Sequence, residues 1–230
     1  HVHGEYADPG SNLSTYVYWD LVNEALIEDK PVLRAYLDDW NNRIHERHPQ
    51  NVVDLSVEMM NKIIALMPEH ASAQAFEDLG IQFTKTCVAN GIIREDAMAY
   101  VRACLARGER CVFSTGGYYD SAVGLLKGLV AEGVLPEDAT SKITVLGSTV
   151  AWPTREMSFV NVGPNKTISL QIEVPDWRAD ETLGFYCDDP EGNDSGLADL
   201  VPADTLFVIG TDKNKGVSYP RTDWTTISKG

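Results

Sequence analysis

Ser114 and Thr115 are the residues of this sequence best placed to hold an anion. They follow the apolar run Cys111–Phe113 and precede Gly116 and Gly117, at the point where a helical pattern begins. A helix N-terminus favours negative charge, because its first backbone N–H groups have no partner within the helix. Ser and Thr also cap helices without any ligand, so the segment fits either a phosphate site or an ordinary helix start.

A second candidate is the acidic segment that follows the apolar run Leu183–Cys187. It places four carboxylates within seven residues, in the order Asp188-Asp189-Pro190-Glu191-Gly192-Asn193-Asp194. This density of negative charge is costly unless a cation compensates it, and Mg²⁺ prefers one or two carboxylates together with waters and a substrate phosphate. A solvated turn is the alternative, because Asp-Pro and Gly-Asn form turns readily.

Lys166 lies between these two segments, at the end of the turn Gly163–Lys166. A lysine in a turn is usually solvated, and alone it predicts nothing. Its interest comes from the order along the chain: a hydroxyl after one strand, then a lysine, then a strand that ends in acids.

The elements that must position these residues differ between the two halves of the chain. From Ser14 to about Arg107, apolar residues recur at helical spacing. The pattern predicts a helical pair before Trp40, and then helices over Val52–Met67, Ala71–Asn90 and Arg94–Arg107.

The second half alternates strands, loops and helices. A helix is predicted over Tyr119–Gly133, and short strands over Cys111–Phe113, Ile143–Leu146, Thr154–Val162, Thr167–Gln171, Leu183–Cys187 and Thr205–Ile209. Such alternation indicates an α/β fold with a parallel sheet covered by helices. Ligands of these sheets bind outside the carboxyl ends of the strands, where the candidate residues stand.

Composition narrows the classes of partner. With 34 acidic and 19 basic side chains among 230 residues, the net charge of −15 argues against nucleic acid and anionic membrane surfaces, which need clustered Lys and Arg. The apolar runs are far shorter than the roughly 20 residues that span a bilayer. A hydrophobic content of 43% supports a globular core, and the length predicts one large domain or a core with a smaller insert.

The order of the motifs resembles the haloacid dehalogenase (HAD)-like superfamily, and most closely its phosphoserine and secreted phosphorylcholine phosphatases. The second motif of the family, Ser or Thr before Gly-Gly-aromatic, is matched by Thr115-Gly116-Gly117-Tyr118. The third, Gly-x-x-Lys, is matched by Gly163–Lys166, and the fourth, two spaced aspartates, by Asp189 and Asp194. The resemblance covers almost the whole chain.

The fold that this resemblance implies is α/β, a three-layer Rossmann-like HAD core with a parallel sheet and an inserted helical cap domain. The core would comprise residues 1–13 and 108–230, and the cap would comprise residues 14–107.

The first motif of the family, Asp-x-Asp-Gly-Thr-Leu, is where this sequence departs. The best match is Ala7–Leu13, which keeps Asp8 but has Gly10 in place of the second Asp. A second register aligns His1–Gly4 with the motif and leaves neither carboxylate. The Asp8 register is preferred, because it keeps a carboxylate and the following Leu13, and leaves residues 1–7 as a first strand.

The resemblance assigns a role to each motif. Asp8 would be the nucleophile, and Thr115 and Lys166 would hold the phosphoryl oxygens. The remaining substrate contacts would come from Ser114, Gly116 and Gly117, and Mg²⁺ would be held by Asp8, the carbonyl of Gly10, Asp189 and Asp194.

The implied function is a magnesium-dependent phosphoric monoester hydrolase, acting on a small soluble phosphorylated substrate through an aspartyl phosphate. Gly10 removes the general acid–base, a group worth roughly 10² to 10⁴-fold in rate. The alternative is therefore a catalytically impaired HAD-like protein that binds a phosphate-bearing or other small ligand without turnover. The oligomeric state is left open.

The cellular compartment is also left open. The chain begins at His1 without a Met, which fits either a removed leader or a cut at this point, and its four cysteines show no CxxC pair. Buried free thiols are expected, with a Cys87–Cys104 bridge as the alternative. A secreted or periplasmic location is slightly favoured over a cytoplasmic one.

Overall fold

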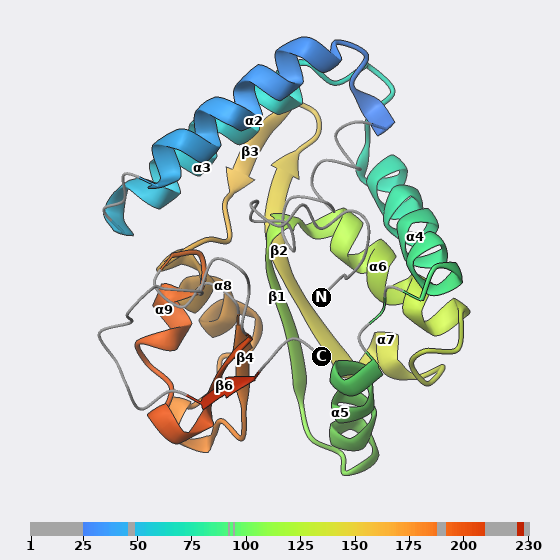
Figure 1. Cartoon of the computed structure of the whole chain (residues 1–230), viewed down its shortest axis with the longest axis vertical. Coiled ribbons are helices and arrows are strands. Elements are labelled where there is room, and N and C mark those ends of the chain that lie inside the picture. The colour runs from blue at the N-terminus through green and yellow to red at the C-terminus, as the bar shows by residue number, and fades with distance from the viewer. Residues whose placement is uncertain are drawn as a thin grey trace.

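The computed structural model describes residues 25–45, 49–91, 93, 95–187, 192–209 and 225–227. These residues form an α/β structure with two small sheets of three strands each and helices around them (Figure 1). The α/β class expected from the alternation of the second half is confirmed.

The first sheet is mixed, in the order β1-β2-β3. β1 (Cys111–Tyr118) runs parallel to β2 (Ile143–Ala151), and β3 (Glu156–Phe159) pairs antiparallel with β2. β1 and β2 contain the strands expected at their starts and continue beyond them, so polar residues after Phe113 and Leu146 still belong to the sheet.

Both faces of the β1–β2 pair are buried. Val112 and Leu146 pack in a cluster with Leu170 of α8 (Asn165–Glu173), whereas their neighbours Phe113 and Val145 pack in a cluster with α6 (Tyr119–Ala131). Because successive side chains of a strand point to opposite faces, apolar runs without alternation give a strand that is covered on both sides. Figure 1 shows α6 and α8 on opposite sides of this pair.

The second sheet contains β4 (Phe185–Cys187), β5 (Leu206–Ile209) and β6 (Thr225–Ile227), all parallel. It shares a core with the first sheet, because Phe185 packs in the same cluster as Val112 and Leu146. The strands predicted in this region are present, each within one or two residues of its expected start.

A helical hairpin forms the upper edge of the molecule in Figure 1. Its helices are α2 (Lys30–His45) and α3 (Pro49–Ala65). Their buried residues recur at helical spacing, which is why the sequence pattern identified them: Leu33, Leu37 and Trp40 on one helix, and Val52, Met59, Met60 and Ile63 on the other.

Polar contacts join this hairpin to the β2–β3 turn. The Met157 N–H donates to Asn61 Oδ1 at 2.8 Å, and the Arg155 guanidinium donates to the carbonyls of Ile64 and Met67. The Ile64 carbonyl lies in the last turn of α3 and the Met67 carbonyl lies just beyond it, where backbone acceptors lack α-helical partners. A side chain from the β2–β3 turn thereby bonds to carbonyls at and just after the α3 terminus.

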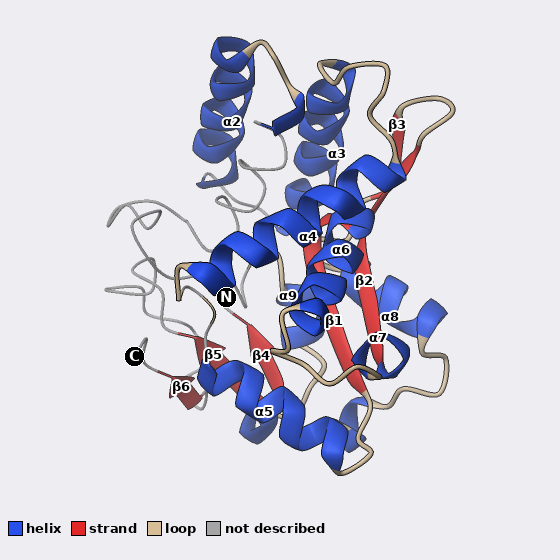
Figure 2. Cartoon of the chain, turned by 90° about the vertical axis from the view of Figure 1, so that its right-hand side faces the viewer, coloured by secondary structure: helices blue, strands red, loops and turns tan. Residues whose placement is uncertain are grey.

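α4 (Ala73–Ala89) packs against α6 with almost no space between the two backbones. A Cβ added to Gly124 would lie 2.0 Å from the Glu77 carbonyl oxygen, and one added to Gly80 would lie 2.2 Å from the Ser121 oxygen. Figure 2 shows α4 on the outer side of α6. Only glycine permits this approach.

α5 (Glu95–Ala106) also packs against the α/β elements, through Leu105 in a cluster with Leu126 of α6 and Phe113 of β1. All described regular elements before residue 107 apart from the isolated bridge residue Ile93 are helices, as expected. The domain boundary at residue 107 stays a prediction; α4 and α5 contact α6 and β1, whereas α3 contacts β3.

One predicted strand is wrong. Thr167–Gln171 lies inside α8, and β3 is shorter than the expected Thr154–Val162. The alternation of apolar and polar residues in this segment imitates a strand, yet its buried positions Lys166, Leu170 and Val174 are four residues apart. Pro164 at the N-cap starts the helix, since its fixed φ suits a helix beginning.

The remaining elements are short. They are α7 (Ala139–Lys142), α9 (Ser195–Ala198) and the 3₁₀ turns Ala179–Glu181 and Ala203–Thr205. Among the described helices, none combines the length and apolar character needed to cross a membrane.

Candidate functional site at the carboxyl end of β1

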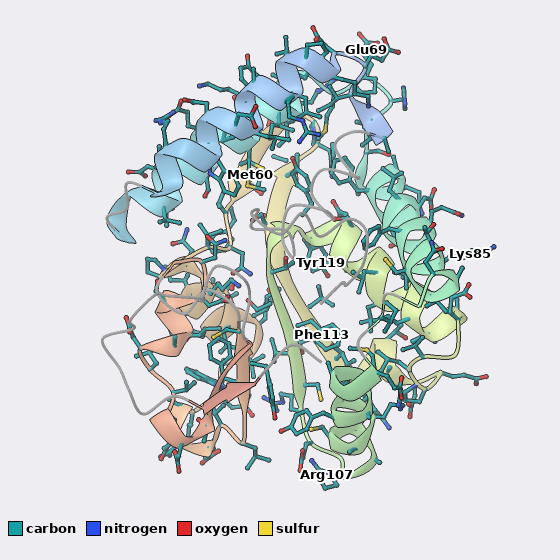
Figure 3. The ribbon with its side chains drawn as sticks, in the orientation of Figure 1. Met60, Glu69, Lys85, Arg107, Phe113 and Tyr119 are labelled. Atoms are coloured by element: carbon teal, nitrogen blue, oxygen red, sulfur yellow. The ribbon has the colours of Figure 1, made fainter. Side chains whose placement is uncertain are left out.

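The segment predicted to bind phosphate is an irregularity in β1. Ser114 lies opposite Leu146 and Tyr118 lies opposite Ser148, so residues 115–117 of β1 face Gly147 alone. Extra residues in one strand interrupt the ladder and leave backbone groups without cross-strand partners. We call residues 115–117 the β1 bulge. Figure 3 marks this end of the strand by Tyr119, the first residue of α6.

Side chains supply the partners that the β1 bulge lacks. Asn161 Nδ2 donates to the Thr115 carbonyl at 2.9 Å, and Ser148 Oγ donates to the Gly116 carbonyl at 2.7 Å. Within the bulge, the Gly117 N–H donates to Thr115 Oγ1 at 3.0 Å. Thr115 Oγ1 therefore accepts a hydrogen bond and keeps its own proton to donate.

Asn161 connects the bulge to its surroundings. Its side chain is fully buried, and its Nδ2 also lies 3.2 Å from Ser114 Oγ. Its N–H donates to Ser148 Oγ at 2.9 Å, and its Oδ1 accepts from Ser169 Oγ at 2.6 Å. One buried amide thus links β1, β2 and α8.

Lys166 reaches the same place from α8. It is the second residue of this helix and is only 4% exposed, contrary to the solvated position expected of a lysine in a turn. Its Nζ donates to Asp194 Oδ1 at 2.5 Å and lies 3.5 Å from the Ser114 carbonyl oxygen. The helix rotation that buries Leu170 also turns Lys166 inward, because the two residues are one turn apart.

Asp194 is held by a turn that docks on the start of α8. The Gly163 N–H donates to the Asn193 carbonyl at 2.9 Å, and Thr167 Oγ1 donates to the Gly196 carbonyl at 2.8 Å. A Cβ on Gly196 would lie 2.4 Å from the Gly163 oxygen, so the two segments touch through their backbones. This contact fixes the distance between Lys166 and Asp194.

The electrostatics of the site are dominated by this buried ion pair. Both side chains are removed from water, and their opposite charges are in direct contact. Two opposite charges in such surroundings attract strongly, but the loss of hydration offsets most of the gain. The pair therefore serves to hold an ammonium group beside Ser114 rather than to add stability.

Tyr118, the aromatic residue of the second motif, has a different role. Its side chain is buried, and its ring meets Phe76 of α4 edge to face with 4.7 Å between centroids. Burial raises the pKa of its phenol above the usual range. Tyr118 anchors the end of β1 in the core, next to the β1 bulge.

The predicted site residues divide into two groups. The structure brings Ser114, Thr115, Gly116 and Gly117 together with Lys166 and Asp194. Asp8, Gly10 and Asp189 lie outside the described residues. A Cβ on Gly116 would lie 2.9 Å from Val162 Cγ1, so the second motif requires a small residue there.

The described part of the predicted metal site is Asp194. A carboxylate is a donor that Mg²⁺ prefers, and the buried Asp194 fits that role, although its Oδ1 already accepts from Lys166. A cation there would lie beside the ammonium group and share the carboxylate with it. Among the residues that the structure describes, no three His, Cys, Asp or Glu side chains form a metal-binding group.

Sequence reasoning missed Asn161, Ser148 and Ser169. Asn161 carried a signal, because it is a lone polar residue between Val160 and Val162 in an apolar run. A fully buried amide needs hydrogen-bond partners, and the carbonyls of an interrupted strand supply them. Ser148 and Ser169 stand among other hydroxyl residues and gave no such signal.

Comparison of the chain with protein-family models, with curated protein sequences and with solved structures finds no match.

Proposed function

We propose that the protein is a magnesium-dependent phosphoric monoester hydrolase with a HAD-like core and a helical cap, acting on a small phosphorylated substrate. The observation that supports this proposal is the meeting of Lys166, Asp194 and Ser114 from three separate motifs, with 2.5 Å between the charged atoms of the first two. A buried ammonium next to a hydroxyl-bearing bulge suits the oxygens of a phosphoryl group.

In the proposed reaction, Asp8 attacks phosphorus, the bond to the substrate oxygen breaks, and an aspartyl phosphate forms. Lys166 compensates the charge of the phosphoryl oxygens, while Asp194 holds its ammonium in place. The Thr115 hydroxyl donates its proton to another of these oxygens, oriented by the Gly117 N–H that it accepts. When bound, Mg²⁺ would neutralise further negative charge on the phosphate.

The second candidate function is binding without turnover, and Gly10 is the residue that favours it. A side chain at this position would protonate the leaving group and activate water, and glycine supplies neither step. The Lys166–Asp194 pair and the β1 bulge would still bind phosphate. The two functions therefore differ in turnover and not in affinity for the anion.

Hydrolysis of p-nitrophenyl phosphate with Mg²⁺ and with EDTA tests the proposal. We expect hydrolysis that is lost in EDTA and in Asp8→Asn, and retained in Asp38→Asn, a matched change at an exposed carboxylate of α2. Phosphate binding without hydrolysis would favour the second candidate. The absence of both, or activity that survives Asp8→Asn, would refute the assignment of Asp8.

Rapid-quench kinetics separate the two steps. Without a base at position 10, the aspartyl phosphate should accumulate as a burst, because p-nitrophenolate leaves without protonation but water still needs activation. Gly10→Asp should raise the steady rate toward the roughly 10²-fold lower bound for general acid–base catalysis. A missing burst together with an unchanged rate in Gly10→Asp would mean that another group acts as the base.

A further inference from the structure

The β1 bulge lies at the centre of the candidate site, yet the β1–β2 ladder does not hold it. Its residues face Gly147 alone, so cross-strand pairing cannot fix the position of Thr115. An unsupported loop with two successive glycines would sample many conformations, since glycine restricts the backbone least. Some other contact must set where the Thr115 hydroxyl points.

We propose that Asn161 and Ser148 are positioning residues that fix the β1 bulge for anion binding. Each takes a different carbonyl: Asn161 Nδ2 donates to Thr115, and Ser148 Oγ donates to Gly116. The two residues are also bonded to each other, through the Asn161 N–H and Ser148 Oγ. The bulge is thus held at two successive peptide groups by one connected unit.

The orientation of the Asn161 amide is itself fixed. Ser169 Oγ lies 2.6 Å from Asn161 Oδ1 and 3.1 Å from the Lys166 carbonyl oxygen. A hydroxyl that donates to the amide oxygen leaves the amide nitrogen to face the bulge. Ser169 therefore couples the turn of α8 that carries Lys166 to the side chain that holds Thr115.

This arrangement explains how a fully buried asparagine is accommodated between the apolar residues Val160 and Val162. Burial of an amide is unfavourable unless its donors and acceptor are satisfied. Here its side-chain partners are the Thr115 carbonyl of the bulge, the adjacent Ser114 hydroxyl and the Ser169 hydroxyl of α8. The amide links the Thr115 carbonyl to the helix that presents Lys166, so two of the proposed phosphate ligands keep a fixed separation.

The test compares Asn161→Ala and Ser148→Ala with Ser158→Ala as the matched control. Ser158→Ala also removes one serine hydroxyl, but at an exposed position of β3 where Ser158 Oγ lies 2.8 Å from Thr149 Oγ1. Two readouts are needed: hydrogen exchange of the peptide that covers Ser114–Tyr118, and binding of inorganic phosphate and of Mg²⁺.

We expect faster exchange of this peptide in both variants and wild-type exchange in Ser158→Ala. The dissociation constant for phosphate should rise about tenfold in Asn161→Ala, which loses hydrogen bonds of ordinary strength, and less in Ser148→Ala. Affinity for Mg²⁺ should not change, because neither residue is among the proposed metal ligands. A general loss of structure would weaken the binding of phosphate and of Mg²⁺ alike. Ser148→Ala is the smaller change and is included as the variant that disturbs the fold less.

The claim that the fixed bulge binds an anion rests on the proposed function. The claim that Asn161 and Ser148 fix the bulge does not. Unchanged exchange in both variants would overturn the inference, and so would faster exchange with wild-type affinity for phosphate. If the wild-type protein binds no phosphate, the proposed function fails and anion positioning fails with it. Hydrogen exchange then still decides whether Asn161 and Ser148 fix the bulge.

Discussion

Two ion pairs of this protein join segments far apart in the sequence but lie in opposite surroundings. The side chains of Lys166 and Asp194 are 5% and 10% exposed, whereas those of Arg43 and Glu58, which join α2 to α3, are 37% and 42% exposed. The N–O distances are 2.5 and 3.0 Å. Geometry alone does not distinguish these pairs; burial does.

This difference in burial decides how much each ion pair contributes to the stability of the protein. Water screens the exposed pair, so its loss changes stability little. The buried pair has lost its hydration, and its attraction roughly repays that loss while both partners remain. A buried pair is therefore weak as a source of stability but costly to break from one side. That asymmetry suits a site in which a lysine must stay charged and fixed.

The largest expected effect is the removal of one buried partner. Lys166→Met leaves the Asp194 carboxylate without its ammonium, and we expect the free energy of unfolding to fall by about 3–5 kcal/mol. Urea denaturation measures this change. The paired variant Lys166→Met with Asp194→Leu removes both charges and should recover most of the loss, because apolar replacements of buried pairs are often neutral or stabilising.

The same two variants also separate stability from binding. The double variant should be folded yet unable to bind inorganic phosphate, since no ammonium remains beside Ser114. If the double variant is as unstable as Lys166→Met, burial of charge is not the cause. If Lys166→Met costs no more than a surface change, the comparison of the two pairs breaks down.

The sequence predicted the elements better than their ends or their contacts. The helices of the first half follow from the spacing of residues such as Leu33, Leu37 and Met60, because a buried helix face has its own period. The strands before Ser114 and Asp188 follow from apolar runs of the right length. α8 was mistaken for a strand because Ile168, Leu170 and Ile172 alternate with polar residues, although in the helix Leu170 is buried and the two isoleucines are exposed.

The candidate site was only partly accessible from the sequence. Ser114, Thr115, Lys166 and Asp194 were predicted from their order along the chain, and the structure places them together. The burial of Lys166 was not predicted, because it depends on the rotation of α8 and on a turn 28 residues later. The role of Asn161 depends on a register shift in β1, which no local pattern announces.

An effect of intermediate size tests whether an uncharged buried contact tolerates substitution as poorly as the buried ion pair does. Gly124→Ala places a Cβ 2.0 Å from the Glu77 oxygen, so α4 and α6 must separate. We expect a loss of about 1–3 kcal/mol from overpacking, although alanine is favoured over glycine by about 1 kcal/mol inside a helix. Lys85→Ala, at an exposed position of α4 (Figure 3), should change stability by less than about 0.5 kcal/mol.

Urea denaturation of Gly124→Ala and Lys85→Ala measures these changes in the free energy of unfolding. A stabilised Gly124→Ala would mean that helix propensity outweighs the contact and that the two helices separate easily. A loss nearly as large as that of Lys166→Met would show that contact, rather than charge, governs the interior of the protein.

The smallest expected effect concerns the exposed pair and depends on pH. Arg43, and then Lys62, donate to the Glu58 carboxylate and lower its pKa from 4.5 to about 2. A carboxyl whose pKa is depressed by folding stabilises the protein above its unfolded value and loses that contribution as pH falls through the folded value. Glu58→Gln should therefore lower the melting temperature slightly at pH 7, and its difference from wild type should shrink between about pH 4.5 and pH 2.

Glu69→Gln, at an exposed carboxylate after α3 (Figure 3), controls for the loss of one negative charge. Added salt should reduce the Glu58→Gln difference at pH 7, because exposed charges are screened. A difference that survives both high salt and pH 2 would mean that Glu58 acts through packing, and the contrast between the exposed and buried pairs would then be one of shape rather than of hydration.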